Sequence, residues 1–293
     1  MSGLVEMFCS IDDFWKSFKS KWDSHLIENG RSHRGPDPAL TIPEMMTIVV
    51  MFHQSHYRNF KHFYLHVETF LWREFPQLIS YSRFVYLMKC LFVPLFAYLL
   101  HCKGLITGIA FIDSTSICVC HNKRISRNRV FKGLAKRGKT TSGWFYGFKL
   151  HLIINDKGEI LAFQLTPGNV ADVTMVETLT HGLWGKLFGD KGYISSQLAK
   201  DLFTRGLQLI TGLRSSMKQK LMLVEDKILL RKRSIIETVN DQLKNISQIE
   251  HTRHRSPANF LVNLLCGLVA YAHQPKKPSL NLHNFTEPFP VAA

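Results

Sequence analysis

The pattern of apolar and polar positions changes near residue 105, which predicts two regions of different architecture. Before that point the apolar positions are typical of helices. The sequence Thr41-Ile-Pro-Glu44 has the residue types of a capping box with an early proline, and an apolar run follows it. Aromatic-rich helical segments are predicted at 59–75 and 80–90, each ended by a following proline. We expect a small helical bundle with its own core.

Beyond residue 105 the pattern is typical of strands that alternate with helices. An apolar run at 105–112 ends at Asp113, and the runs at 144–154 and 159–165 flank the turn sequence Asp156-Lys157-Gly158, a strong hairpin signal. Shorter elements are predicted after the hairpin: helices at 172–180, 195–204 and 234–246, and strands at 186–188 and 207–213. This order predicts an α/β fold in which helices cover both faces of a mixed sheet.

The same pattern predicts how the chain is divided. Residues 1–105 form a mostly α-helical N-terminal domain, residues 106–273 form the α/β domain, and residues 274–293 form an extended tail. The length of 293 residues and the 45% hydrophobic content are ordinary for a globular protein with one or two domains.

Charge separates the two regions further. The formal net charge is +15, and residues 106–293 contribute 26 basic and 13 acidic side chains against 11 and 9 in residues 1–105. No acid lies between Asp113 and Asp156, and the basic residues of that interval are Lys123, Arg124, Arg127, Arg129, Lys132, Lys136, Arg137, Lys139 and Lys149. The positive charges of such a run repel one another, which favours a polyanion partner over a merely solvated loop.

Several classes of protein are disfavoured by the same reading. No stretch reaches the roughly 18 consecutive apolar residues of a membrane span, and the first residues lack the design of a secretion signal. Six cysteines are scattered without a paired framework, as in reduced proteins. We expect a cytoplasmic protein without a membrane partner.

The few acids of the basic region are informative by their placement. Asp113 follows the apolar run GIAFI and Asp190 follows KLFG, so both carboxylates are predicted at strand ends, where sites form in open α/β sheets. Glu237 lies beside the apolar side of a predicted helix. Three converging carboxylates repel one another, and divalent ions such as Mg²⁺ resolve that repulsion. The alternative is that each acid caps a strand end or pairs with a nearby Lys or Arg.

The motifs around these acids resemble a known family. Asp113 in FIDSTS, Asp190 in GDKGY and Glu237 in IIETVNDQLK resemble the Asp-Asp-Glu triad of bacterial insertion-sequence transposases of the DDE type. The segment GFKLHLIINDKGEILAFQLTPGNVADVTM also looks like the hairpin and Gly-Asn-x-x-Asp turn of that family, with Asn169 and Asp172 as the matching polar residues. The resemblance covers about residues 105–250.

The predicted helix around Glu237 carries the most specific motif. Many of these transposases have a Tyr-x2-Arg-x3-Glu-x6-Lys signature, and Arg233, Glu237 and Lys244 match its last three positions. Leu230 stands at the Tyr position, so no role of that Tyr is carried over. Arg233 and Lys244 share a helix face with Glu237 by their spacing.

The resemblance implies a ribonuclease-H-like fold and a two-metal active site. Asp113, Asp190 and Glu237 would bind Mg²⁺, with Mn²⁺ as a substitute and two ions as the expected number. Arg233 and Lys244 would contact DNA phosphates near the scissile bond, beside the basic run of residues 123–139. The N-terminal domain would bind the element's ends, and the enzyme would act as a dimer or higher oligomer on double-stranded DNA.

The function that these features favour is DNA transposition, by cleavage at the ends of an insertion sequence and transfer of the 3′-hydroxyl into target DNA. One alternative is a ribonuclease-H-like nuclease without strand transfer. Another is a catalytically inactive basic DNA-binding protein whose acids are structural.

Overall fold

The computed structural model describes residues 2–28, 38–141, 143–213, 217, 221–250 and 254–280. The chain divides into two compact units. The helical unit comprises the residues up to Cys102 together with Leu243–Gln274, and the sheet unit comprises Lys103–Gln242 and the residues after Gln274. The division into functional domains at 1–105, 106–273 and 274–293 stays a prediction, and residues 281–293 of the predicted tail lie outside the described part.

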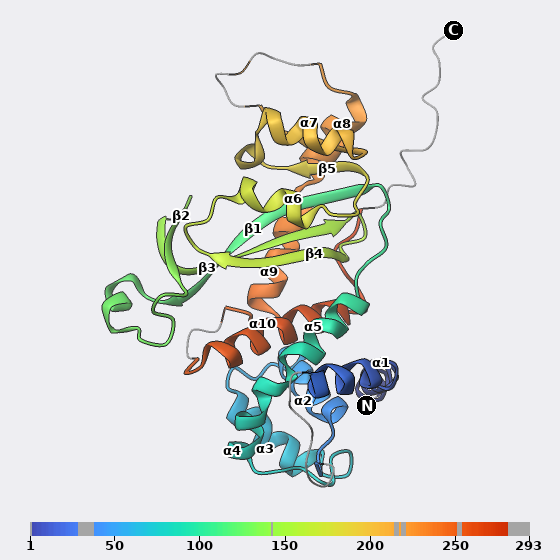
Figure 1. Cartoon of the computed structure of the whole chain (residues 1–293), viewed down its shortest axis with the longest axis vertical. Helices are drawn as coiled ribbons and strands as arrows, with labels where there is room; N and C mark the ends of the chain where they lie inside the picture. The colour runs from blue at the N-terminus through green and yellow to red at the C-terminus, as the bar shows by residue number, and fades with distance from the viewer. Residues whose placement is uncertain are drawn as a thin grey trace. The chain divides into compact units, whose positions relative to one another are not determined.

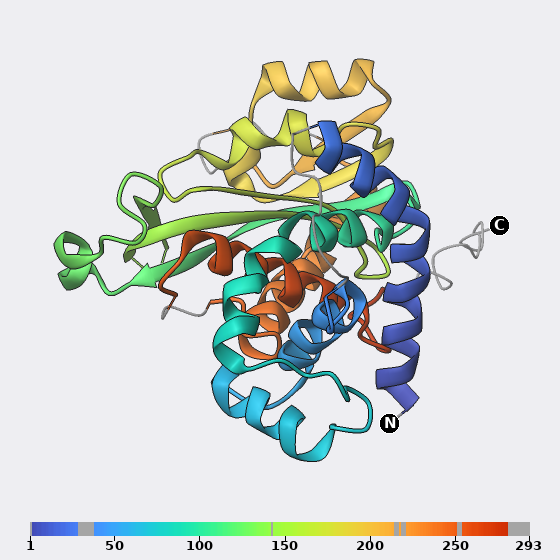
Figure 2. The same cartoon turned by 60° about the horizontal axis from the view of Figure 1, so that its bottom comes forward.

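The helical unit is built around one buried helix. Its elements are α1 (Ser2–Glu28), α2 (Ile42–Gln54), α3 (Phe60–Phe70), α4 (Tyr81–Leu87), the 3₁₀ turn η1 (Met88–Leu91), α5 (Phe92–His101) and α10 (Pro257–Ala272). Helix α10 packs on α2 and α5, as Figures 1 and 2 show. It is apolar nearly all round, which is typical of a central helix. The sequence pattern indicates only an apolar run there.

The local signals at the helix ends are partly confirmed. The capping box of α2 is present: Glu44 N–H donates to Thr41 Oγ1 at 3.3 Å, and Thr41 N–H donates to Glu44 Oε2 at 2.7 Å. The predicted helix at 59–75 ends earlier, at Phe70. The segment predicted at 80–90 continues through η1 and α5 to His101, so Pro94 does not end it. Pro94 lies in the first turn of α5, where its missing N–H is tolerated.

By length and composition alone, the helical stretch Tyr81–His101 is apolar enough to cross a membrane. In the structure its Phe84, Leu91, Leu95 and Tyr98 are fully buried in the core of the helical unit. Only 33% of its most apolar window is buried, and Tyr86, Val93 and Phe96 of the same stretch are exposed, so packing in the core accounts for part of its apolar character.

The sheet unit contains a mixed six-stranded sheet. Its strands are β1 (Ile109–Cys120), β2 (Lys136–Thr140), β3 (Gly143–Asn155), β4 (Ile160–Pro167), β5 (Gly185–Gly189) and β6 (Leu207–Thr211). The order is β2-β3-β1-β5-β6, and β4 also pairs with β3. Strand β3 is antiparallel to β1, β2 and β4, whereas β5 is parallel to both β1 and β6. The predicted α/β class with a mixed sheet and a helical N-terminal region is confirmed.

The predicted hairpin is strands β3 and β4, whose turn uses Gly158 at φ 71°. Strand β2 escaped prediction because its sequence, KRGKT, has no apolar alternation. Strand β1 runs to Cys120, well beyond the predicted end at Ile112. Its polar second half is a strand because it pairs with β3 along its whole length.

Helices lie against both faces of the sheet. On one face of the sheet, Ile112 and Leu187 pack against residues of α6 (Val176–Leu179) and α7 (Ser196–Thr204). The opposite face is met by α8 (Val224–Lys232), whose Asp226 pairs with Lys186 at 2.6 Å, and by α9 (Ser234–Asn245). Figure 1 shows α6 in front of the strands and α9 behind them.

Candidate active site

Asp113 lies inside β1, at the point where that strand loses its parallel neighbour. The prediction that Asp113 ends a strand is therefore wrong, because β1 continues to Cys120 beside β3. The parallel partner β5 ends at Gly189, and the two strands pair as far as Phe111 with Phe188. From this level onward, among the described strands, only β3 pairs with β1, so Asp113 has no strand neighbour on its β5 side.

Asp190 is the first residue after β5. Continuing the parallel register by two residues beyond Phe111 and Phe188 brings Asp113 level with Asp190 on the same face of the sheet. The two phenylalanine rings stack below them with centroids 5.5 Å apart. The Asp190 carboxylate is fixed by its own turn, since Oδ1 accepts a hydrogen bond from Gly192 N–H at 2.8 Å. The strand-end position predicted for Asp190 matches this geometry.

Helix α9 brings Glu237 to the same face. Ile236 and Val239 are fully buried and hold the helix against its neighbours. Asn240, one turn after Glu237, donates from Nδ2 to Asp113 Oδ2 at 3.0 Å. Residues three apart lie on one helix face, so Glu237 and Asn240 both approach the Asp113 side of the sheet.

The three acids share one electrostatic environment. The pKa of Asp113 is raised to about 6, chiefly by burial; the charge of Arg233 lowers it, and the charges of Asp190 and Glu237 make smaller contributions that raise it. A carboxyl with a raised pKa is typical of sites where like charges gather away from water. The triad acids therefore lie within electrostatic reach of one another.

Arg233 contacts the triad directly. Its Nη2 donates to Glu237 Oε1 at 2.7 Å, in an ion pair whose side chains are 21% and 55% exposed. Within the described residues no group of three His, Cys, Asp or Glu side chains is close enough to hold a metal ion. The Arg233 guanidinium supplies a positive charge beside Glu237.

Lys244 is on the last turn of α9, in the part of the helix that belongs to the helical unit. Its Nζ pairs with Glu250 Oε2 at 3.4 Å. The signature residues thus have separate partners: Arg233 pairs with a triad acid and Lys244 with an acid of the helical unit.

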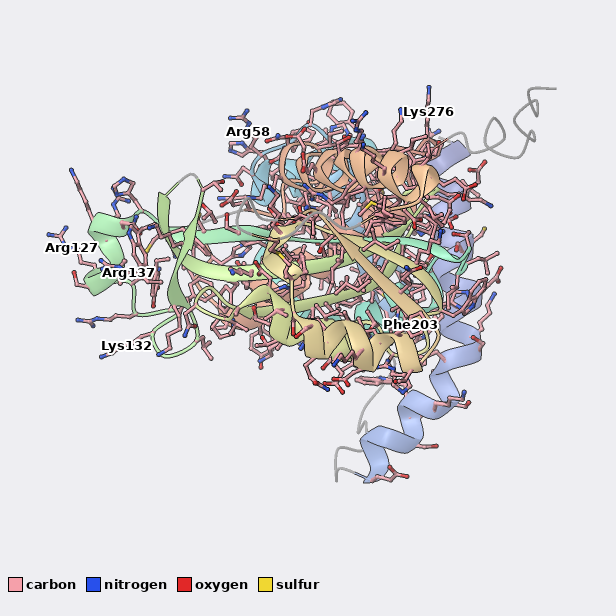
Figure 3. All side chains as sticks on the ribbon, turned by 90° about the horizontal axis from the view of Figure 1, so that it is seen from above. Arg58, Arg127, Lys132, Arg137, Phe203 and Lys276 are labelled. Atoms are coloured by element: carbon pink, nitrogen blue, oxygen red, sulfur yellow. The ribbon has the colours of Figure 1, made fainter. Side chains whose placement is uncertain are left out.

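The basic run forms an exposed arm of the sheet unit, here called the basic segment. Its members are all exposed to solvent: Lys123, Arg124, Arg127, Arg129, Lys132, Lys136, Arg137 and Lys139. In the described part of the chain none of these eight forms an ion pair with an acid. Figure 3 shows Arg127, Lys132 and Arg137 gathered at one end of the sheet and projecting from it. Trp144, next to Lys139 in the β2–β3 pair, is 60% exposed.

Lys149, the ninth basic residue of that run, belongs to a different cluster. Its Nζ donates to Asp172 Oδ1 at 3.0 Å, and Ser114 Oγ donates to the same oxygen at 2.8 Å. His151 is fully buried with Nδ1 3.8 Å from that carboxylate, and burial lowers the pKa of His151 to about 4. This histidine is therefore neutral at neutral pH.

Tyr193 is a site residue that the sequence reasoning missed. It is buried in the turn after Asp190, and its pKa is raised by burial and by the charges of Asp113, Asp172 and Asp190. Its ring packs beside Gly189 in the apolar core on the α6 and α7 face of the sheet, within electrostatic reach of these acids. The sequence Asp190-Lys-Gly-Tyr193 carries the signal, because a tyrosine that closes a short turn after a site acid packs back beside it.

Residues 103–257 match a family model described as "Transposase DDE domain". No curated protein matches the chain. Among solved structures, the cryo-EM structure of a piggyBac transposase synaptic complex with hairpin DNA is similar in fold, with a TM-score of 0.50 and 11% sequence identity over 92% of this chain and 72% of that chain. The family model covers more than half of the sequence and includes all three acids, and the chain therefore belongs to the DDE transposase domain family.

Proposed function

We propose that this transposase is encoded by a bacterial insertion sequence, cleaves DNA at the ends of that element, and joins the freed 3′-hydroxyl to target DNA. The observation that carries the proposal is the approach of Asp113, Asp190 and Glu237 from two parallel strands and one helix. Cytoplasmic DNA is the substrate. We also propose that at least two copies act together, because transposition must hold two ends.

By chemical type the donor atoms of the triad suit Mg²⁺, and binding an ion would require the three carboxylates to come closer together than they lie in the structure. Carboxylate oxygens are the hard ligands that this ion prefers, and burial, the main cause of the raised pKa of Asp113, disfavours a negative charge that a bound cation would offset. Asp113, Asp190 and Glu237 would hold the metal, with Mn²⁺ as a substitute. Two bound ions supply activation of a water or hydroxyl nucleophile and stabilisation of the leaving oxygen.

The chain's own residues prepare this site. Asn240 orients the Asp113 carboxylate through Oδ2, and the backbone of Gly192 orients that of Asp190. Arg233 holds Glu237 and partly neutralises the cluster. If Glu237 bound a metal, the Arg233 guanidinium would be released from their ion pair and would be available to a DNA phosphate, the role that we propose for it together with Lys244. Arginine suits this exchange because its fork matches carboxylate and phosphate alike.

The basic segment is the proposed contact with the phosphates of double-stranded DNA. Exposed Lys and Arg side chains without acid partners bind phosphates by releasing counterions, so their contribution depends on salt. This contribution is independent of base sequence, and we therefore expect the segment to position DNA rather than to select the element's ends.

The K132A/R137A double variant is expected to reduce the salt dependence of duplex binding. Removing one cation that binds a phosphate lowers the slope of log Kd against log salt by about 0.9, so a reduction of about two is expected. The measurement is fluorescence anisotropy of a labelled duplex across a salt series. The matched control is K16A/K19A, which removes the same charge from α1, where both lysines already pair with acids. Equal slopes for the two double variants would contradict the assignment.

Cleavage of DNA that carries the gene's own flanks tests the proposed function. With Mg²⁺ or Mn²⁺ we expect nicks at the element boundaries, and we expect the D190N variant to bind the same DNA without cutting it. Cutting without preference for the boundaries, lost in D190N, would favour a ribonuclease-H-like nuclease without strand transfer. Binding without cleavage by either protein would favour the inactive DNA-binding protein.

A further inference from the structure

The helical unit contains a cavity of about 1120 Å³, here called the helical-unit cavity. All of its lining residues belong to that unit, from α2, α3, α4 and α10 and from the chain that follows Leu243. Neither the triad nor the basic segment contributes to it. A cavity of this volume is large enough for a ligand of nucleotide size or more.

The charge of the lining is strongly positive. Four basic side chains line the cavity: Arg58, Lys61, Lys244 and Arg255. The single acid of the lining is Glu250, which lies 3.4 Å from Lys244. Arg58 and Arg255 are exposed at the mouth, and Figure 3 shows Arg58 at the surface of the helical unit. This balance favours an anionic ligand.

A buried amide in the wall lacks a partner. Asn263 is 8% exposed, and its Nδ2 has no hydrogen-bond partner among the described residues. A buried N–H₂ without an acceptor is costly. Asn263 is one of the residues that line the cavity, and its Nδ2 atom itself is covered by protein. Gln248, also in the lining, has φ 49°, a conformation in which a residue other than glycine is strained. Such strain is common where a backbone is shaped for a ligand.

Aromatic rings complete the lining. Phe60 and Tyr81 are partly buried with their centroids 6.3 Å apart, and Phe52 lies edge-on to Phe60 at 5.3 Å. Cations that bind phosphates, rings on which bases stack, and amides that bond to base edges together make a site for unpaired nucleotides.

We propose that the helical-unit cavity binds a short single-stranded stretch of DNA, with phosphates on Arg58 and Arg255 and a base on Tyr81. This proposal rests on the proposed function, because both require that the chain binds DNA. It adds a nucleotide-binding site outside the triad and the basic segment. Lys244, seven residues after Glu237 on α9, lines this cavity, so a strand seated there contacts the helix that carries a triad acid.

The test is binding of a fluorescein-labelled oligothymidylate to the full chain, measured by anisotropy without divalent metal. We expect Y81L to raise the Kd of the oligothymidylate about tenfold or more, since loss of base stacking weakens binding without changing charge. The matched control is Y86L, because Tyr86 is 58% exposed on α4 and does not line the cavity. Thermal unfolding of both variants verifies that the helical unit is intact.

A second pair of variants separates the cavity from general electrostatics. R58A/R255A is expected to weaken oligothymidylate binding more than duplex binding, whereas R129A/K132A on the basic segment is expected to do the reverse. Equal losses in the two double variants, or an unchanged Kd for Y81L in a folded protein, would overturn the proposal.

Cleavage of flanking DNA is measured separately. If the chain binds oligothymidylate through Tyr81 but does not cleave, the cavity site is supported and the proposed transposase function is contradicted. If it cleaves but Tyr81 does not affect oligothymidylate binding, the function is supported and the cavity site is contradicted.

Discussion

The D113N variant is expected to lose DNA cleavage by about a thousandfold or more while becoming more stable than the native chain above pH 6. Loss of activity follows if the Asp113 carboxylate is needed to hold a metal. The gain in stability follows from the cost of keeping that carboxylate charged, because burial and the charges of Asp190 and Glu237 raise its pKa to about 6.

The sign of the pH dependence follows from that shift. The folded protein binds the Asp113 proton more tightly than the unfolded chain, whose carboxyl has a pKa near 3.8. The stabilisation that this proton contributes is complete below about pH 4 and is lost as the pH rises through 6. A pKa difference of about two between the folded and unfolded chains corresponds to about 3 kcal/mol of unfolding free energy at neutral pH. Asparagine never ionises, so the variant avoids this loss, and its side-chain oxygen still accepts from Asn240.

Urea denaturation at about pH 4.5 and about pH 8 measures the gain in stability and its dependence on pH. The difference in unfolding free energy between D113N and the native chain is expected to grow by about 2–3 kcal/mol between the two pH values. The D172N variant is the control, since it removes the same charge from a carboxylate that accepts from Ser114 and Lys149. Loss of that pairing lowers stability by about 1–3 kcal/mol at pH 8. If D113N is also less stable than the native chain at pH 8, burial does not disfavour the charged Asp113 carboxylate and the prediction is wrong.

The strand pattern predicted much of the candidate site. Asp190 follows a short apolar run that is a strand, and the parallel register with β1 makes Asp113 its neighbour. The sequence misplaced the end of β1, because Ser114–Ser116 are polar and give no strand signal. Their strand conformation comes from pairing with His151, Leu150 and Lys149 of β3, a long-range interaction that a local pattern does not contain.

The partners of the site residues were harder to predict than their positions. The spacing of Arg233 and Glu237 fits both an ion pair along the helix and two side chains that face DNA, and the structure has the ion pair. The contact between Asn240 and Asp113 joins residues 127 positions apart, and Tyr193 packs from the turn after Asp190 into the core formed with α6 and α7. The roles of these residues depend on packing between elements, which the sequence pattern does not specify.

The central strand contains a position where even one methyl group does not fit. Gly147 of β3 pairs with Lys136 of β2 on one side and with Cys118 of β1 on the other. A Cβ at Gly147 would lie 1.9 Å from the carbonyl oxygen of Ile117. That oxygen belongs to the backbone of the strand that carries Asp113, so no side-chain rotation relieves the clash.

The G147A variant is therefore expected to lose about 3–5 kcal/mol of unfolding free energy, a loss at the upper end for single substitutions. Urea denaturation of the full chain measures it. The matched control is G3A, because Gly3 lies in α1 with nothing within 4 Å of a new Cβ, and alanine there changes stability by about 1 kcal/mol or less in the favourable direction. Equal urea midpoints for G147A and G3A would mean that β1 and β3 move apart at Gly147 without a loss of stability. The register that aligns Asp113 with Asp190 would then not depend on the close approach of the two strands.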